Sequence, residues 1–331
     1  RYPNQIPYMT SYYEKKWGFC LSYNQLNKLP KGDYKVHVNS TLRKGKMDYG
    51  EVLIKGKSKR EIFFSTYICH PSLANNELSG PLLTTFLISQ IKKNFKKTKF
   101  SYRFIFIPET IGAIAYIKKN LKVLRKNMLA GYVISCVGDD RNYSHVESRM
   151  GNTLADQSLE ASFIGLKNSK KYSFLKRGSD ERQYCSPGID LPVAGFCRTR
   201  YGDYPEYHSS ADNLNLINKN GFKGSYDIMM NIIKSFELGL YPINIIKCEP
   251  MLSKRNLYHL TTDKKNIGKA PMGSDIPSEY GVERRMNVLA YSDGQHSIFE
   301  IAKKIKEPLK EVIKEIKVLS SNNLIKFDKL K

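Results

Sequence analysis

The chain has 331 residues, of which 41% are hydrophobic and 11% aromatic. This length and composition fit one large domain with a smaller one and exclude a disordered chain. The formal net charge of +23 is typical of nucleic-acid-binding proteins, but the basic residues are spread over the whole chain. Because a nucleic-acid site needs a clustered basic patch, the sequence argues against a nucleic-acid partner.

No run of about eighteen apolar residues occurs, so we expect no contact with a membrane. The start of the chain has no export signal and no initiator Met, which predicts a fragment or a processed form. The six cysteines form no CxxC pair and no disulfide-like framework. A reduced, cytoplasmic protein is therefore expected, with six thiols at Cys20, Cys69, Cys136, Cys185, Cys197 and Cys248.

The N-terminal part, residues 1–60, is aromatic and β-rich. Its aromatic residues predict a small core or a lid, since such side chains dominate buried area. The alternation of residues 34–39 predicts a half-buried strand, and residues 51–54 predict another.

Strands then alternate with helices up to residue 248. Buried strands are predicted at 61–68, 102–107, 131–137 and 191–196, and helical periodicity follows the first two. Further helices are predicted at 152–164 and 222–240. Ser79 is expected to cap the first helix of this series, with Pro81 in its first turn. This alternation predicts an α/β/α sandwich around a mostly parallel sheet, with the whole domain covering residues 1–248.

Residues 249–282 have little periodicity and are interpreted as a linker. Residues 283–331 then show three short helical patterns and a terminal strand, which is the outline of a winged helix. Its third helix, residues 309–320, alternates Lys with Glu and has no Arg, Asn or Gln at its front. That pattern favours a protein contact or dimerisation over DNA reading, and leaves a homo-oligomer open.

Polar residues follow several predicted strands, where the loops of an open α/β sheet form binding sites. Two histidines with several carboxylates and open access are typical of a catalytic zinc site, in which three protein ligands leave room for water. We predict one zinc ion held by His70, Asp139 and His208. Glu109 is predicted as the general base, which takes a proton from water and passes it to the leaving amine.

Further side chains are expected around this site. Asp180 is predicted to orient the base or the substrate, although an ion pair with Arg182 is an alternative. Strand-end capping for His70, helix capping for Glu109 and turn formation for Asp139 are alternatives of the same kind. The predicted substrate-binding residues are Asn76, Arg182, Tyr184 and Tyr207.

Four segments resemble the zinc aminopeptidases of the M28 class, and more closely their bacterial aminopeptidase-like relatives of the DUF4910 family, which add a winged helix. The segments are HPSLANNELSG at 70–80, PETIG at 108–112, GSDERQY at 178–184 and YPEYH at 204–208. The resemblance covers nearly the whole chain and implies a zinc-aminopeptidase-like fold. It also implies a metal-dependent hydrolase encoded near surface-polysaccharide genes, and more chain before Arg1 in the relatives.

The sequence departs from the peptidase pattern at three positions. Ser72 stands where that pattern has Asp, Asn76 stands in place of an Asp that bridges two zinc ions, and Thr110 replaces the second of two paired glutamates. A neutral amide is a poor bridge between two cations, so we expect one zinc ion instead of two.

Two functions follow as hypotheses. The first is a zinc-dependent hydrolase of a small peptide or another amide-bearing substrate, for example a deacylase in surface-polysaccharide metabolism. The second is a catalytically degenerate peptidase fold that serves as a binding or regulatory module, with the winged helix contacting a partner or DNA. The retention of His70, Glu109 and His208 favours the first hypothesis.

Overall fold

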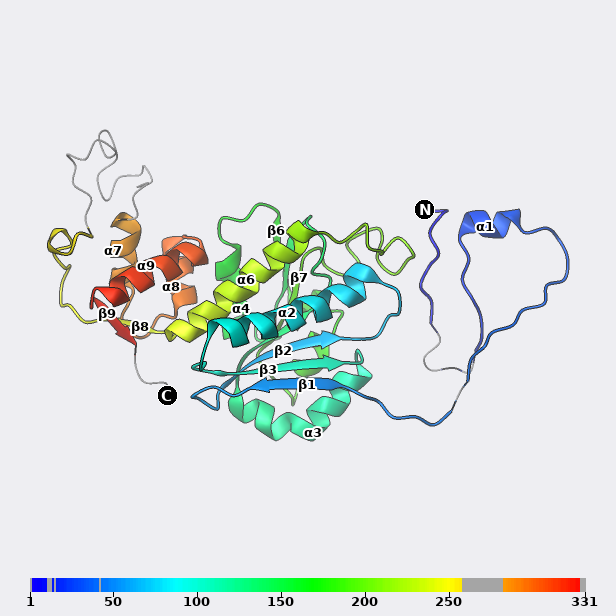
Figure 1. Cartoon of the computed structure of the whole chain (residues 1–331), viewed down its shortest axis with the longest axis horizontal. Coiled ribbons are helices and arrows are strands. Elements are labelled where there is room, and N and C mark those ends of the chain that lie inside the picture. The colour runs from blue at the N-terminus through cyan, green and yellow to red at the C-terminus, as the bar shows by residue number, and fades with distance from the viewer. Residues whose placement is uncertain (1, 11–13, 15, 42, 258–281, 328–331) are drawn as a thin grey trace, which may run out of the picture.

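The computed structural model describes residues 2–10, 14, 16–41, 43–257 and 282–327. Seven strands form one sheet in the order β1-β3-β2-β4-β7-β5-β6 (Figure 1). Neighbouring strands are parallel except that β1 runs antiparallel to β3 and β5 runs antiparallel to β7. The expected mostly parallel sheet is therefore confirmed. The strands are β1 (Gly50–Ile54), β2 (Glu61–Tyr67), β3 (Ser101–Ile107), β4 (Met128–Ile134), β5 (Tyr143–Val146), β6 (Ser169–Tyr172) and β7 (Val193–Cys197).

Helices cover both faces of the sheet, which explains why its central strands β2, β3 and β4 are buried along nearly their whole length. Alternate side chains of β2 enter different cores: Ile62 and Phe64 face one layer, and Phe63 faces the other. The first layer holds α2 (Ser79–Asn94), α4 (Leu154–Phe163) and α6 (Lys219–Leu238). The second holds α3 (Ile111–Asn127) and the short α5 (Glu181–Tyr184) (Figure 1). The chain thus forms the predicted three-layer sandwich.

Two local predictions at the strands need correction. Residues 34–39 form no strand and are exposed, because no neighbouring strand lies beside them to complete a hydrogen-bond ladder. Ser79 is not a helix cap. It lies inside a continuous helical run, because a π-helical turn (Ala74–Leu78) leads directly into α2, and its hydroxyl donates to the Asn75 carbonyl.

The N-terminal segment, which we define as residues 2–10 and 16–29, reaches the carboxyl-end side of the sheet (Figure 1). Its helix α1 (Tyr23–Lys28) begins with a capping box in which Ser22 and Gln25 satisfy each other's backbone amides. Residues 6–8 of the segment lie against residues 208–210. The amide of Tyr8 donates to the His208 carbonyl at 2.8 Å, and the amide of Ser210 donates to the Ile6 carbonyl at 2.8 Å.

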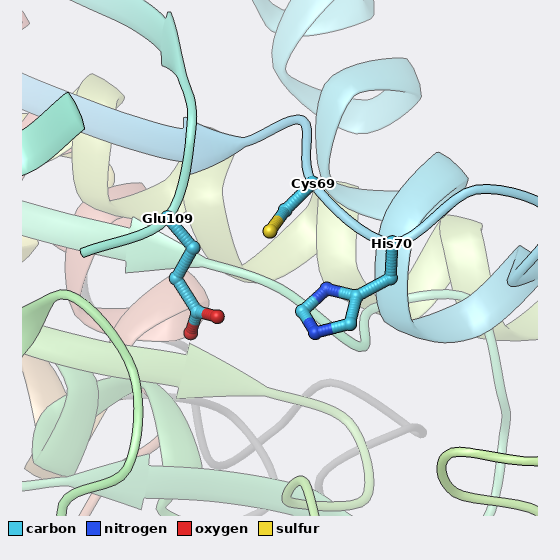
Figure 2. A group of neighbouring side chains, drawn as sticks. All are labelled: Cys69, His70 and Glu109. Carbon is cyan, nitrogen blue, oxygen red and sulfur yellow. The ribbon is translucent and has the colours of Figure 1, made fainter. Parts of the chain in front are cut away.

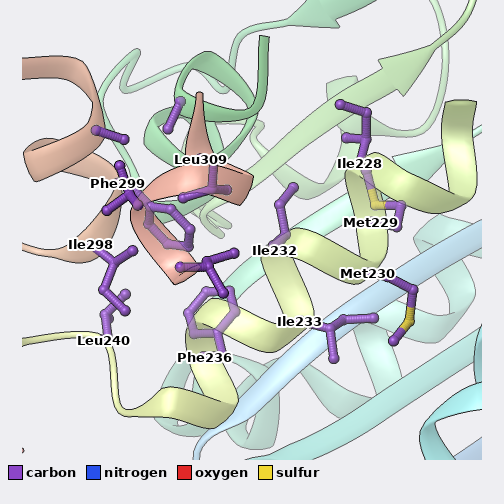
Figure 3. Packing of buried hydrophobic residues seen from close by; sticks show 14 of the residues in the cluster. Ile228, Met229, Met230, Ile232, Ile233, Phe236, Leu240, Ile298, Phe299 and Leu309 are labelled. Carbon is purple, nitrogen blue, oxygen red and sulfur yellow. The ribbon is translucent and has the colours of Figure 1, made fainter. Parts of the chain in front are cut away.

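The C-terminal unit has the predicted three helices and strand. These are α7 (Val282–Ala290), α8 (Ile298–Ile305), α9 (Leu309–Ser321) and β9 (Ile325–Phe327), and β9 pairs with β8 (Pro242–Asn244). α8 and α9 pack on α4 and α6, where Phe299 meets Phe236 edge to face at 5.5 Å between ring centroids (Figure 3). Of the predicted linker, residues 258–281 lie outside the described residues.

Two further findings bear on the expected environment of the chain. Within the described residues, no helix combines the length and apolar character needed to cross a bilayer. All six cysteines lie in the described part, and none of them forms a disulfide.

Candidate metal centre

The loops that follow β2 and β3 bring three potential ligands together at the carboxyl edge of the sheet. Cys69 and His70 come directly after β2, and Glu109 comes after β3. One donor atom from each side chain lies within 4.8 Å of the other two. Figure 2 shows the three side chains pointing toward one another. Because β2 and β3 are parallel neighbours, their carboxyl ends coincide, and this places the two loops side by side.

His70 is held in place by Glu77. The Glu77 carboxylate lies 2.7 Å from His70 Nδ1, and its other oxygen accepts from the Cys69 amide at 2.6 Å. Burial disfavours the charged imidazole, yet the hydrogen bonds with Cys69 and Glu77 outweigh burial and raise the pKa of His70 to about 10. Since Nδ1 is engaged by Glu77, a metal ion would bind at Nε2 and would displace the proton that this nitrogen carries in the charged ring.

The π-helical turn places Glu77 next to His70. Asp212 accepts hydrogen bonds from the amides of Asn75 and Asn76, at 2.6 and 3.1 Å, and so caps the start of the turn. Gly80 permits the close approach of this turn to the sheet, because a side chain there would collide with the Thr66 hydroxyl and the Ile134 carbonyl. The loop geometry therefore depends on contacts with β2 and β4.

His208 lies beside His70, with 4.8 Å between ring centroids. Tyr207 stacks on His208 at 3.9 Å between ring centroids. Tyr8 from the N-terminal segment contacts both imidazoles, with a tilted ring at 5.1 Å from His70 and edge to face at 5.7 Å from His208. His208 Nε2 is buried and has no hydrogen-bond partner within the described structure. Burial and the neighbouring His70 lower the pKa of His208, which favours the neutral imidazole that binds metals.

The loop that carries Glu109 is held by Asp180 and Arg182, which both contact the next residue, Thr110. The amide of Thr110 donates to Asp180 at 2.8 Å, and Arg182 donates to the Thr110 hydroxyl at 2.6 Å. Thr110 has φ 62°, a conformation that costs energy and that these two contacts hold. Burial raises the pKa of Glu109, while His70 and Arg182 oppose the rise. Burial likewise raises the pKa of Asp180, to about 8.

The structure does not bring every predicted site residue to this group. Asp139 is buried away from it, because its carboxylate accepts from Asn75, the Thr199 amide and hydroxyl, and the Arg141 amide. Tyr184 is fully buried in the core beneath the sheet and contacts the Ser65 hydroxyl at 3.0 Å, so it does not line a surface pocket. These positions correct the expected zinc ligand and the expected substrate contact.

The other predicted residues lie at the site. Asn76 is buried beside His70, at 3.5 Å between Nδ2 and Nδ1, and its Oδ1 has no partner among the described residues. Tyr207 stacks on His208, and Arg182 reaches Thr110 next to Glu109. Asp180 supports the loop that carries Glu109 without joining the three-ligand group.

The donor set fits a single divalent cation. Thiolate, imidazole and carboxylate are all zinc ligands, and a second imidazole with an unpartnered buried nitrogen lies next to them. An ion there would satisfy the His208 nitrogen, which is otherwise costly to bury. The neutral amide of Asn76 supplies no charge for a second ion, and the count of one ion stays a prediction.

Sequence reasoning missed Cys69, Glu77 and Tyr8. Cys69 was treated only as one of six reduced thiols, although it directly precedes His70 in the loop after the strand. Glu77 follows the substituted Asn76 directly, and a carboxylate one residue from a lost carboxylate was the available signal. Nothing in the sequence placed Tyr8 near residues 70 and 208, since that contact joins distant parts of the chain.

Comparison with known proteins matches both parts of the chain. Residues 6–238 match the family described as a domain of unknown function (DUF4910), and residues 240–327 match a winged helix-turn-helix family. The chain is 41% identical over 305 residues to a Clostridium acetobutylicum protein provisionally named as a polysaccharide biosynthesis protein with an aminopeptidase-like domain. That alignment covers 91% of this chain and 66% of the other, so this chain spans about two thirds of the relative's length.

A crystal structure from Clostridium acetobutylicum, provisionally named as a peptidase, superposes with a TM-score of 0.83 at 36% identity. The superposition covers 98% of this chain and 71% of the crystallised chain. An aminopeptidase from Aneurinibacillus sp. strain AM-1 gives a TM-score of only 0.48 at 20% identity, over 56% of this chain and 47% of that chain, which is too weak to support a functional argument. The chain therefore belongs to the DUF4910 family, with an aminopeptidase-like α/β fold followed by a winged helix.

Proposed function

We propose that the chain is a metal-dependent hydrolase of an amide bond, with one zinc ion at the candidate centre. The observation that carries the proposal is the convergence of Cys69, His70 and Glu109 within 4.8 Å, next to the unpartnered buried nitrogen of His208. His70, His208 and Cys69 would hold the ion, and Glu109 lies close enough to act as ligand or base. When bound, zinc supplies the Lewis acidity that activates water and polarises an amide carbonyl.

The residues of this chain supply the proton transfer and the orientation. Glu109 accepts the proton of the attacking water and delivers it to the leaving amine, for which a carboxyl group with a raised pKa is suited. Asp180 and Arg182 fix the loop of Glu109 through Thr110, and Glu77 fixes the ring of His70. Asn76 would contact the substrate, a role supported by its position beside His70 and by its buried Oδ1, which has no partner among the described residues. Both a peptide and a sugar-linked amide contain the bond that this reaction would cleave. The name of the 41% identical relative favours a substrate from polysaccharide metabolism.

A second candidate is a binding or regulatory module without catalysis. The neutral Asn76, with its buried oxygen unpartnered among the described residues, favours it, because the peptidase pattern places a carboxylate there. The two candidates differ in whether the loaded chain hydrolyses amides.

The test is zinc binding and hydrolysis in the same preparations. Wild type, His208→Ala and the control His37→Ala, at an exposed histidine, are stripped of metal and titrated with Zn²⁺ by calorimetry. We expect one site per wild-type and His37→Ala chain, and binding at least tenfold weaker in His208→Ala. A panel of amino-acid anilides and N-acetyl amides then measures hydrolysis with and without chelator. Equal zinc binding by all three proteins would overturn the metal centre. Zinc binding without hydrolysis of any compound in the panel would rule out the hydrolase and favour the binding module.

A further inference from the structure

A cavity of about 690 Å³ opens next to His208, on the side of the N-terminal segment. Its size lies in the range of pockets that hold small molecules. His208 is shared between this cavity and the candidate metal centre, because its ring also lies 4.8 Å from that of His70. A ligand in the cavity is therefore adjacent to the groups assigned to hydrolysis.

The N-terminal segment builds most of the cavity wall, and backbone hydrogen bonds hold it in place. The Tyr8 amide donates to the His208 carbonyl, and the Ile6 amide donates to the Ser210 hydroxyl at 3.0 Å. Within the segment, the Asn24 amide donates to the Pro3 carbonyl at 3.0 Å, which joins the first residues to α1. The walls are thus fixed to the loop that carries His208.

The lining is mainly apolar and aromatic, with Gln5, His208 and Ser209 as its polar members. Among the described residues that line the cavity, none is Asp, Glu, Lys or Arg, so a charged group would find no countercharge there. Two tyrosine rings and aliphatic side chains offer flat and branched surfaces for an apolar group. The residues on which this argument rests are Tyr2, Pro7, Leu21, Tyr23, Leu26 and His208.

We propose that this cavity is a specificity pocket, which binds a neutral aromatic or branched aliphatic substituent of the substrate next to the amide that is cleaved. The inference rests on the proposed function for the identity of the substrate as an amide. It adds that the substituent is uncharged and apolar, and that the N-terminal segment selects it. Burial of that substituent against Tyr23 and Leu26 supplies the discrimination.

Binding to the metal-free protein tests the pocket separately from catalysis. The probes are N-acetyl-phenylalaninamide, N-acetyl-glycinamide and N-acetyl-lysinamide, titrated by calorimetry in the presence of EDTA. We expect wild type to bind the phenylalanine probe at least about tenfold more tightly than either of the others, because a pocket of this kind discriminates apolar groups by that factor or more. Similar affinity for all three probes would overturn the proposal.

Leu26→Trp fills the pocket, and Leu29→Trp, at the residue that directly follows the same helix, is the matched control. Both leucines are exposed, at 56% and 44%, so neither change disturbs the core, and Leu29 does not line the cavity. We expect the preference for the phenylalanine probe to vanish in Leu26→Trp and to persist in Leu29→Trp. Tyr23→Ser, at a second lining residue, should reduce it at least threefold. Loss in the control equal to that in Leu26→Trp would contradict the assignment.

The outcomes separate this pocket from the proposed function. Selective probe binding without hydrolysis by the zinc-loaded chain keeps the pocket and removes the hydrolase. Hydrolysis that proceeds at equal rates for the glycine and phenylalanine amides keeps the hydrolase and removes the pocket.

Discussion

At the carboxyl end of the sheet the chain buries several ionisable groups, whereas the opposite end, where the winged helix packs (Figure 1), buries mostly apolar side chains. The carboxyl end holds buried polar atoms without partners among the described residues, on Asn76, Asp180, Arg182 and His208. The winged-helix end instead continues the main hydrophobic core from α6 into α8 and α9 (Figure 3).

The backbone does not share this contrast. Ser72, Thr110 and His208 have positive φ at the carboxyl end, and Leu240 and Lys306 have it at the winged-helix end. Such conformations cost about 1–3 kcal/mol each and persist where the surrounding structure holds them. The carboxyl end therefore differs from the winged-helix end in its buried polar atoms without partners among the described residues, and not in its backbone conformations.

Glu109→Gln is expected to break the chemistry without breaking the fold. Removing the base should lower kcat by about 10²- to 10⁴-fold, which is the usual contribution of a positioned general base. Because burial raises the pKa of Glu109 and so disfavours its charge, a neutral amide should leave the thermal midpoint unchanged or raise it. Steady-state kinetics and thermal unfolding measure the two effects.

Glu249→Gln is the control for this change, at an exposed glutamate distant from the site. It should alter neither kcat nor the midpoint. If Glu109→Gln kept wild-type kcat, Glu109 would not be the base.

Phe299→Ala, at the winged-helix end, is expected to lower stability without weakening zinc binding. Phe299 is fully buried and packs on Phe236 between α8 and α6. Its truncation leaves a cavity, which should lower the free energy of unfolding by about 3–5 kcal/mol. Chemical denaturation measures this loss, and Phe299→Leu should lose less because it fills more of the space. If folded Phe299→Ala lost as much zinc affinity as His208→Ala, the winged-helix end and the metal centre would not be independent of each other.

Asp156 provides a third case, a buried carboxylate whose oxygens all have partners. It accepts from the Ser148 amide at 2.8 Å and the Thr153 amide at 2.9 Å, and it contacts His145 at 3.0 Å. Burial alone would raise its pKa, but the hydrogen bonds from His145 and Ser148 outweigh burial and hold it well below the ordinary value. Its stabilising contribution is therefore complete above the unfolded-state pKa of roughly 3.9 and is lost as the pH falls through the lower folded-state pKa.

Asp156→Asn should accordingly lower the free energy of unfolding by about 1–3 kcal/mol at pH 7, and by less at low pH. Urea denaturation at pH 7 and pH 3 compares the variant with wild type. A difference that stays constant between the two pH values would show that the charge of Asp156 contributes nothing.

The sandwich was predictable because hydrophobic residues recur with a different period in its strands than in its helices. β2, β3, β4 and β7 read as apolar runs and α6 as a long amphipathic helix, and all five are found near the expected positions. β5 was missed because it has four residues and pairs antiparallel at one side of the sheet. The expected strand at 34–39 had suitable alternation but no partner, which only the assembled sheet reveals.

The site was predictable to the level of loops and not of side-chain direction. Residues at the ends of parallel strands converge, which placed His70, Glu109 and His208 correctly at one edge. Asp139 also follows a strand, yet its carboxylate accepts hydrogen bonds from Asn75 and Thr199 and does not join the three-ligand group. Whether a strand-end residue faces the ligand or the scaffold depends on its hydrogen-bond partners, and these come from other loops.

The central claim is that one metal ion binds among Cys69, His70 and His208, next to Glu109, at the carboxyl edge of the sheet. Crystals soaked in zinc and measured on both sides of the zinc absorption edge test it directly. The account predicts a single strong anomalous peak per chain within bonding distance of the His70 and His208 side chains. The absence of a peak there, or the strongest peak at another place with these two imidazoles unbound, would contradict it.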